Sequence, residues 1–80
     1  MDYRVEVRVG LKEGVLDAEG ETVQKSLGLL GFNVKRVDAV KVYRITVEAE
    51  SRKKAVEVVE DACERLLANP VIQDYDIKVL

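Results

Sequence analysis

Apolar and polar residues alternate near both ends of the chain. Near the start, one face carries the apolar side chains Tyr3, Val5, Val7, Val9 and Leu11. Near the end, a second apolar face consists of Tyr75, Ile77 and Val79. A period of two is typical of a β-strand with one buried face and one polar face. The pattern therefore predicts one strand over residues 3–11 and another over residues 74–79.

Two other segments repeat their apolar residues every three or four positions, as an amphipathic α-helix does. The first helix is predicted between Asp17, its N-cap, and Gly31, which suits a left-handed C-terminal cap. Its apolar stripe consists of Val23, Leu27 and Leu30. The second helix is predicted between an N-cap at Ser51 and a stop at Pro70. Its broader stripe consists of Ala55, Val58, Val59, Ala62, Leu66 and Leu67.

The segment between the two predicted helices, residues 32–50, is rich in β-branched residues but is too long for one ordinary strand. Its alternation changes phase near residues 38–41. Val40 and Val42 fall on the face opposite to Tyr43, Ile45 and Val47. We interpret the segment as two strands separated by a bulge or turn. Because no Asn-Gly or Asp-Gly turn is present, an extended central hairpin and one long bent strand both fit this pattern.

The resulting order of elements is βαββαβ within a single domain, residues 1–80. This order predicts an α+β fold, a two-layer sandwich with both helices on one face of an antiparallel sheet, as in ferredoxin-like topology. A chain of 80 residues buries a small core, which is commonly supplemented by disulfides, a metal or oligomerisation. One cysteine and no histidine exclude an intrachain disulfide and argue against a zinc site. We therefore expect a homo-oligomer, either a dimer or a tetramer.

The charged residues are balanced and interleaved along the chain. There are 13 basic and 15 acidic residues, with a formal net charge of −2. A surface that binds nucleic acid or an anionic membrane needs a concentrated basic face, which this pattern does not predict. No apolar run approaches the length of a membrane span, and the first residues do not resemble a signal peptide. We therefore expect a cytoplasmic protein that binds neither nucleic acid nor membrane.

No residue pattern in the chain predicts a catalytic, cofactor-binding or metal site. Cys63 lies on the apolar stripe of the second helix and no histidine is available as its base, so we predict a core residue. Asp74 and Asp76 share the open face of the last strand. Arg4 and Arg8 of the first strand face the same side, so cross-strand ion pairs or plain solvation explain the two acids.

A run of three cations is the first candidate surface for binding another protein chain. Arg52, Lys53 and Lys54 fill the first turn of the second helix, where positive charge opposes the helix dipole. One hypothesis is a docking patch for an acidic partner surface or a phosphate. The alternative is a solvated turn, partly offset by a Lys53–Glu57 ion pair.

Val40 and Val42 are the second candidate, as a self-association surface. Two neighbouring valines on an open face are a poor surface for a monomer unless something covers them. A two-fold partner would present the same pair, so that four valines could be buried at once. The alternative is a bulge that turns both valines into the core.

Three segments of the chain resemble those of one protein family. Residues 11–20 read LKEGVLDAEG, residues 41–47 begin with lysine and end with ITV, and residues 63–75 read CERLLANPVIQDY. Over its whole length the chain resembles the PurS-type small subunit of phosphoribosylformylglycinamidine (FGAM) synthase. The family usually has proline where this chain has Ala18, and both residues suit the first helical position. The family usually has glycine where this chain has Val40.

The resemblance implies a non-catalytic subunit of an enzyme complex in de novo purine biosynthesis. In that family, a large synthetase subunit carries the ATP and substrate sites, so ATP and Mg are expected there and no cofactor on this chain. A separate glutaminase subunit releases ammonia from glutamine. The small subunit is expected to join the two and to support ammonia transfer in the formation of FGAM from formylglycinamide ribonucleotide (FGAR).

An ACT-like regulatory domain that binds an amino acid and dimerises is the alternative function for this order of elements. Fold alone does not separate the two functions. A ligand that binds only the native state raises its stability, so an amino acid would stabilise an ACT-like domain and leave a PurS-type subunit unchanged.

Overall fold

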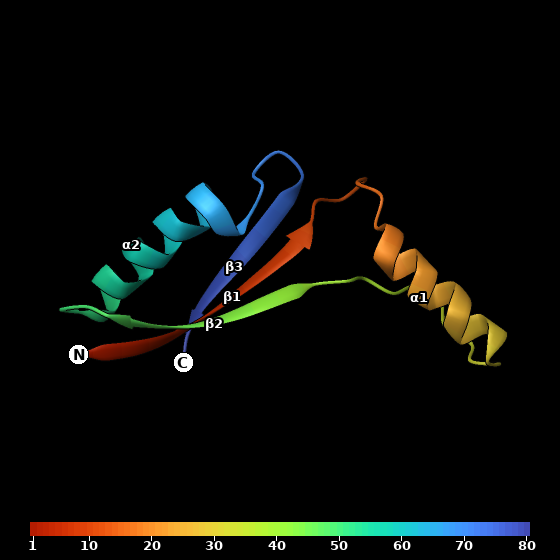
Figure 1. The fold of residues 1–80 in the computed structure, drawn as a ribbon, viewed down its shortest axis with the longest axis horizontal. Coiled ribbons are helices and arrows are strands. Elements are labelled where there is room, and N and C mark those ends of the chain that lie inside the picture. The colour runs from red at the N-terminus through yellow and green to blue at the C-terminus, as the bar shows by residue number, and fades with distance from the viewer.

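A computed structural model describes all 80 residues of the chain (Figure 1). The elements follow in the order β1 (Asp2–Leu11), α1 (Ala18–Leu29), β2 (Lys41–Glu48), α2 (Arg52–Ala62), the π-helical turn η1 (Cys63–Leu67) and β3 (Gln73–Val79). Residues 32–40 form no helix or strand. No helix is long and apolar enough to cross a membrane.

The three strands form one antiparallel sheet in the order β2-β1-β3. Val5 of β1 pairs with Ile45 of β2 on one side and with Val79 of β3 on the other. The β1 residues that face α2 are fully or almost fully buried: Val5, Val7 and Val9. They form the core together with Ala55, Val59, Cys63 and Ala68. The alternation read from the sequence thus places one apolar face of the sheet under α2.

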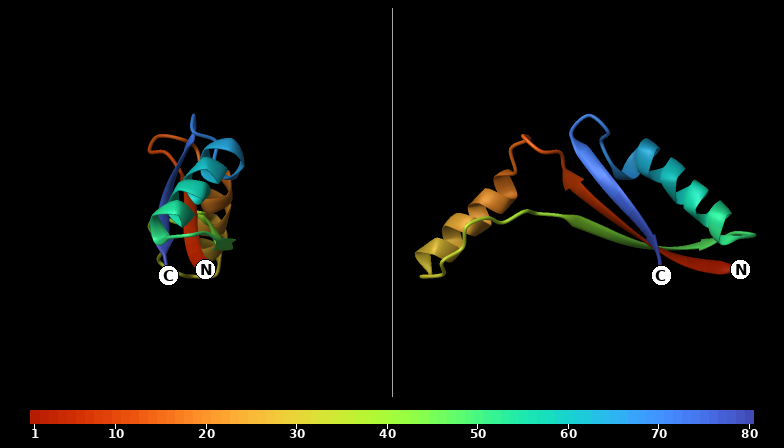
Figure 2. Two further views of the ribbon diagram at one scale, coloured as in Figure 1. Left: turned by 90° about the vertical axis from the view of Figure 1, so that its left-hand side faces the viewer. Right: turned by 180° about the vertical axis from the view of Figure 1, so that it is seen from behind.

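The other helix lies away from this core. Figures 1 and 2 show α2 over the sheet and α1 at the opposite end of the molecule, beyond the end of β1. α2 and η1 pack on the sheet, whereas no comparable packing joins α1 to any strand. The chain is therefore elongated, with principal-axis extents of 51 × 25 × 14 Å.

The α+β class and the antiparallel sheet are confirmed, and two details of the expected arrangement are corrected. Residues 32–40 do not form the fourth strand, because no strand of this chain lies beside them to share a hydrogen-bond ladder. α1 does not cover the sheet beside α2. Nine residues without regular structure on one side and the loop of residues 12–17 on the other hold it at a distance. Of the two alternatives left open for this segment, the central hairpin is absent, since the chain leaves α1 and enters β2 in one extended run.

The accessible surface shows how open this arrangement is. The chain exposes 6292 Å², whereas a compact monomer of 9.0 kDa exposes about 4,900 Å². Its radius of gyration is 16.0 Å, compared with about 11.6 Å for a compact domain of this length. The excess surface, about 1,400 Å², is larger than the 800 Å² or so that each partner buries in a standard protein–protein interface. The isolated chain therefore has the shape of one part of an assembly.

Candidate subunit interface

A clasp of hydrogen bonds fixes α1 to the extended segment that follows it. Asp17 caps α1, and its Oδ1 accepts from the Gly20 N–H at 2.9 Å. Its other oxygen, Oδ2, accepts from the Ala39 N–H at 2.8 Å, which joins residues that are 22 positions apart. The hydrogen bond from the Ala39 N–H is the main cause that lowers the pKa of the Asp17 carboxyl, and the bond from the Gly20 N–H lowers it further. One carboxylate thus starts the helix and anchors the returning chain.

Gly20 lets the two segments of the clasp come together. It is the one buried residue of α1, and a Cβ built on it would overlap the carbonyl oxygen of Val37. Further along the helix, the side chain of Gln24 donates to the carbonyl of Lys35 at 2.9 Å. The orientation of α1 is therefore set by residues 35–39 and not by the sheet.

The end of α1 turns the chain back through a glycine. Gly31 adopts φ +92, the left-handed region that suits glycine. The N–H of Phe32 donates to the carbonyl of Leu27, and the N–H of Gly31 donates to that of Gly28, both at 3.0 Å. This is the Schellman pattern of bonds, so Gly31 occupies the capping position assigned to it from the sequence.

Apolar side chains of α1 and the segment after it lie in solvent. Leu29 is 90% exposed and Leu30 is 74% exposed, although Leu30 belongs to the stripe expected to be buried. Val40 and Val42 are 52% and 46% exposed, so no bulge turns them into the core of this chain. Val23, Val40 and the end of β1 line one side of an open groove of about 760 Å³. This end of the molecule, which we call the α1 end (residues 16–42), carries seven of the thirteen exposed large apolar side chains of the chain.

The basic turn at the start of α2 is exposed. Ser51 caps the helix, its Oγ accepting from the Lys54 N–H at 3.2 Å, and no acidic residue lies in the first turn. The predicted Lys53–Glu57 pair is wrong, because Glu57 pairs with Lys54 instead, at 3.5 Å. Arg52 and Lys53 form no ion pair within the chain. Two of the three cations are therefore free to meet a partner.

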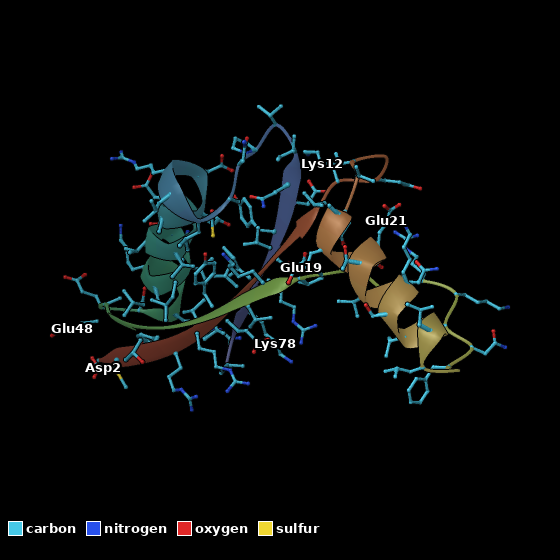
Figure 3. The ribbon with its side chains drawn as sticks, turned by 45° about the vertical axis from the view of Figure 1, so that its right-hand side comes forward. Asp2, Lys12, Glu19, Glu21, Glu48 and Lys78 are labelled. Atoms are coloured by element: carbon cyan, nitrogen blue, oxygen red, sulfur yellow. The ribbon has the colours of Figure 1, made fainter.

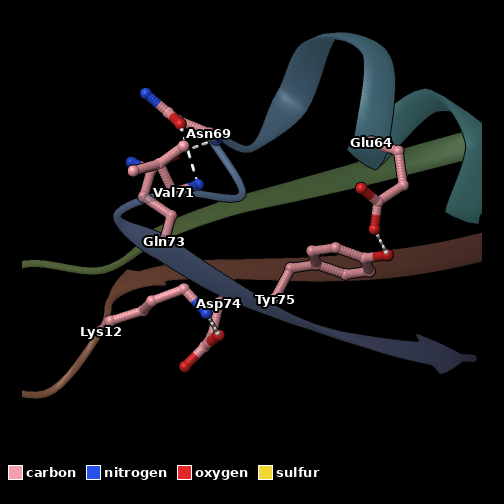
Figure 4. A network of polar contacts seen from close by, with 7 residues as sticks. All are labelled: Lys12, Glu64, Asn69, Val71, Gln73, Asp74 and Tyr75. Atoms are coloured by element: carbon pink, nitrogen blue, oxygen red, sulfur yellow. Dashed lines mark hydrogen bonds and ion pairs between the residues drawn. The ribbon is translucent and has the colours of Figure 1, made fainter.

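Polar contacts tie η1 and the loop after β1 to β3, as Figure 4 shows. The hydroxyl of Tyr75 donates to Glu64 Oε1 at 2.7 Å, which raises the pKa of Tyr75 to about 12. Lys12 Nζ lies 2.8 Å from Asp74 Oδ1 and joins the loop after β1 to the start of β3. Asp74 thus pairs with a lysine that the sequence argument did not single out.

The chain's one thiol is part of the core. Cys63 is fully buried at the junction of α2 and η1. Burial is the main cause that raises its pKa, and Glu64 and Glu60 raise it further. A buried thiol with a raised pKa is a poor nucleophile. No group of three or more potential ligands among His, Cys, Asp and Glu is arranged to hold a metal.

Comparison with known proteins identifies the family. A sequence model of the family described as PurS, phosphoribosylformylglycinamidine (FGAM) synthase, matches residues 4–80. The chain belongs to the PurS family. A PurS subunit from Archaeoglobus fulgidus is 56% identical over 73 residues, which cover 90% of this chain and 91% of the relative. One from Methanocaldococcus jannaschii is 51% identical over 78 residues, covering 96% of this chain and 94% of the relative.

Solved PurS structures share the fold over the whole chain. The crystal structure of Methanocaldococcus jannaschii PurS superimposes with a TM-score of 0.88 at 49% identity, covering 98% of this chain and 95% of that one. A chain in the structure of PurLQS from Thermotoga maritima gives a TM-score of 0.92 at 36% identity, covering 100% of this chain and 99% of that one. The open, elongated shape of the chain is therefore a property of the PurS fold.

Proposed function

We propose that the chain is the small, non-catalytic subunit of FGAM synthase, joining the synthetase and glutaminase subunits and supporting ammonia transfer between them. The observation that carries the proposal is the near-complete match to a chain in a PurLQS structure. The architecture supports it, because more surface is exposed than a monomer of this size needs and the one thiol is buried. The family assignment also replaces the ACT-like alternative.

In this complex each chemical task has its own subunit. Glutamine is hydrolysed on the glutaminase, and ATP with Mg is used on the synthetase to convert FGAR and ammonia into FGAM. The PurS-type chain binds no cofactor and acts by holding the other two in register. We propose that the complex is cytoplasmic, as we expect for an enzyme of de novo purine synthesis.

Self-association is the second part of the proposal. Val40 and Val42 lie on the α1 end, and an identical chain related by a two-fold axis would bring four valines together. The exposed apolar residues of α1 lie at the same end and extend this surface. The basic turn of Arg52, Lys53 and Lys54 lies at the far end of the molecule and is left for a different subunit.

A reconstituted assay tests the proposal. The synthetase and glutaminase subunits from the same organism are combined with and without the chain, and FGAM formation is measured with glutamine and, separately, with ammonia. We expect the chain to be required for the glutamine-dependent rate and much less for the ammonia-dependent rate. A full glutamine-dependent rate without the chain would refute the proposal.

A further inference from the structure

The face of the sheet opposite α2 carries a cluster of cations around one acidic residue. The strand register places Arg44 of β2 and Lys78 of β3 on either side of Glu6 of β1. Arg4 and Arg8 lie two residues before and after Glu6, on the same face. Figure 3 shows Lys78 on the side of the sheet away from α2. We call these five residues the arginine face.

Glu6 is held at the centre of the arginine face by two guanidinium groups. It is 9% exposed and is the one charged residue among the buried ones. Its Oε1 accepts from Nε of Arg44 at 3.3 Å, and its Oε2 accepts from Nε of Arg8 at 3.4 Å. The Arg44 hydrogen bond is the main cause that lowers the pKa of Glu6, so the carboxylate is ionised. A buried charge needs such partners, and Glu6 in turn orients both arginines.

Each arginine has donors to spare. A guanidinium carries five N–H donors, and only the Nε–H of each side chain is used within the chain. The side chains of Arg8 and Arg44 remain 64% and 67% exposed. Lys78 and Arg4 form no ion pair at all. The unused Nη groups are available for the bidentate contacts that arginine makes with carboxylates.

Positive charge exceeds negative charge at this place, although the whole chain carries −2. Four cations surround Glu6, and the acid Asp76 lies opposite Arg8. Asp74, on the same face of β3, is already paired with Lys12. The acids Asp2 and Glu48 pair with each other in the register at the far end of the face. The centre of the face therefore complements an acidic surface.

We infer that the arginine face docks carboxylate side chains of another subunit of the FGAM synthase complex, with Arg8 and Arg44 as the binding groups and Glu6 as the positioning residue. The inference rests on the proposed function. Val42 of the proposed self-association surface lies opposite Arg8, at the edge of this face. A second copy of this chain is a poor occupant of its centre, because a two-fold axis would bring the same cations together. Arginines also bind phosphate, but the central strand β1 offers no free backbone N–H groups of the kind that many phosphate sites add, so we assign the face to carboxylates and test the phosphate alternative below.

The test measures the affinity of the chain for the synthetase and glutaminase subunits over a series of salt concentrations. We expect the double variant Arg8→Gln/Arg44→Gln to bind about tenfold more weakly at low salt, with a smaller salt dependence. Arg8→Lys/Arg44→Lys keeps both charges but loses the fork geometry, and it should not restore binding. Arg65→Gln removes an exposed cation that lies outside both the arginine face and the α1 end, and it should bind as the unmodified chain does.

Glu6→Gln separates positioning from simple attraction. It makes the face more positive, so attraction alone predicts tighter binding to an acidic partner. Loss of the orienting carboxylate predicts weaker binding, which is the result we expect. A thermal melt and the circular dichroism spectrum check that each variant keeps its fold.

Three results would overturn the inference. One is an unchanged affinity of Arg8→Gln/Arg44→Gln at low salt. Another is unchanged assembly combined with lost binding of ATP or pyrophosphate to the isolated chain, which would indicate a small-anion site. The third is unchanged assembly combined with an altered self-association mass, which would assign the face to a second copy. Failure of the unmodified chain to assemble would instead refute the proposed function, and the inference with it.

Discussion

α1 and α2 are helices of almost the same length, 12 and 11 residues, but α2 packs on the sheet and α1 lies in solvent. α2 buries Ala55 and Val59 against β1, whereas the one buried residue of α1 is a glycine. Both helices have a side-chain N-cap and an apolar stripe. The difference lies in the connections, because short turns return α2 to the sheet and an extended run of nine residues leads away from α1.

An apolar stripe on a helix thus predicts that the helix will be covered. It does not predict whether the covering surface belongs to the same chain or to a partner. The stripe of α2 is covered by its own sheet. The stripe of α1 points to a partner, because an exposed leucine-rich helix is costly in water unless another surface covers it. We therefore propose that the two halves of the molecule differ in what stabilises them, the α2 half by its own core and the α1 end by assembly.

Charge placed on a buried side chain of α2 and on an exposed side chain of α1 gives the largest contrast. Val59→Asp buries a carboxylate without a partner, and we expect it to cost more than about 4 kcal/mol and to unfold the chain. Leu29→Asp places the same charge on a side chain that is 90% exposed. In the isolated chain it should change stability by less than about 0.5 kcal/mol. Urea denaturation of both variants checks the prediction, and equal losses would contradict the difference between the halves.

Disruption of the two valines comes next in size. Val40→Lys/Val42→Glu should give a folded species of smaller mass by light scattering, with a lower melting temperature. Full burial of four valines would contribute about 6 kcal/mol, and their partial exposure here reduces this to about 3 kcal/mol before association costs. Unfolding of the variant would instead support the alternative that both valines belong to the core. A folded variant of unchanged mass would show that the surface lies elsewhere.

A pair of glycine variants tests the clasp. Gly20→Ala forces a Cβ against the Val37 carbonyl, and we expect a loss of about 1–3 kcal/mol. Gly28→Ala is the matched control on the same helix, since its Cβ would meet nothing within 4 Å. It should stabilise the isolated chain by up to about 1 kcal/mol. Chemical denaturation measures both, and a Gly20→Ala variant as stable as Gly28→Ala would argue against the clasp.

Acid should loosen the α1 end through Asp17. Its pKa in the folded chain is below the ordinary value of 3.8, so its stabilising contribution is present above that pH and is lost as the pH falls through the folded pKa. Glu6 adds a loss of the same sign below its ordinary value of 4.5. We expect Asp17→Asn to flatten the stability curve below about pH 4. A curve of unchanged shape would show that the carboxylate is not stabilised by its two N–H partners.

The basic turn gives the smallest expected effect. Reversal of Arg52, Lys53 and Lys54 to glutamate should leave the fold intact or slightly more stable, because acids suit the start of a helix. Assembly with the other subunits should weaken severalfold at low salt and become less sensitive to salt. Titration of the complex at two salt concentrations measures this, and an equal affinity at low salt would mean that the turn is solvated.

Local sequence patterns predicted the elements better than the arrangement of those elements. The strand period placed Val5, Val7 and Val9 in the core, and the capping residues at Asp17, Gly31 and Ser51 occupy the ends of their helices. The absence of the fourth strand and the position of α1 could not be predicted from the spacing of apolar residues. Both depend on which surfaces lie beside these segments in the folded chain.

The clasp and the arginine face were missed for a related reason. Gly20 and the second hydrogen bond of Asp17 involve residues 37–39, and nothing in the local sequence connects these positions. In the sequence, Glu6 is simply one of the polar residues of an alternating strand. Only the strand register shows that Arg44 lies beside it. An acidic residue between two arginines at positions 4 and 8 was the one signal that could have pointed to it.

Hydrogen exchange of α1 and α2 tests the central claim most directly. The amides of residues 18–29 and 52–62 are followed in the unmodified chain, in Val40→Lys/Val42→Glu, and in the complex with the synthetase and glutaminase subunits. We expect protection of α2 to be similar in all three, and protection of α1 to be low in the variant and high in the assembled states. Equal protection of α1 and α2 in a monomeric variant would contradict the account, because α1 would then be stable without a partner.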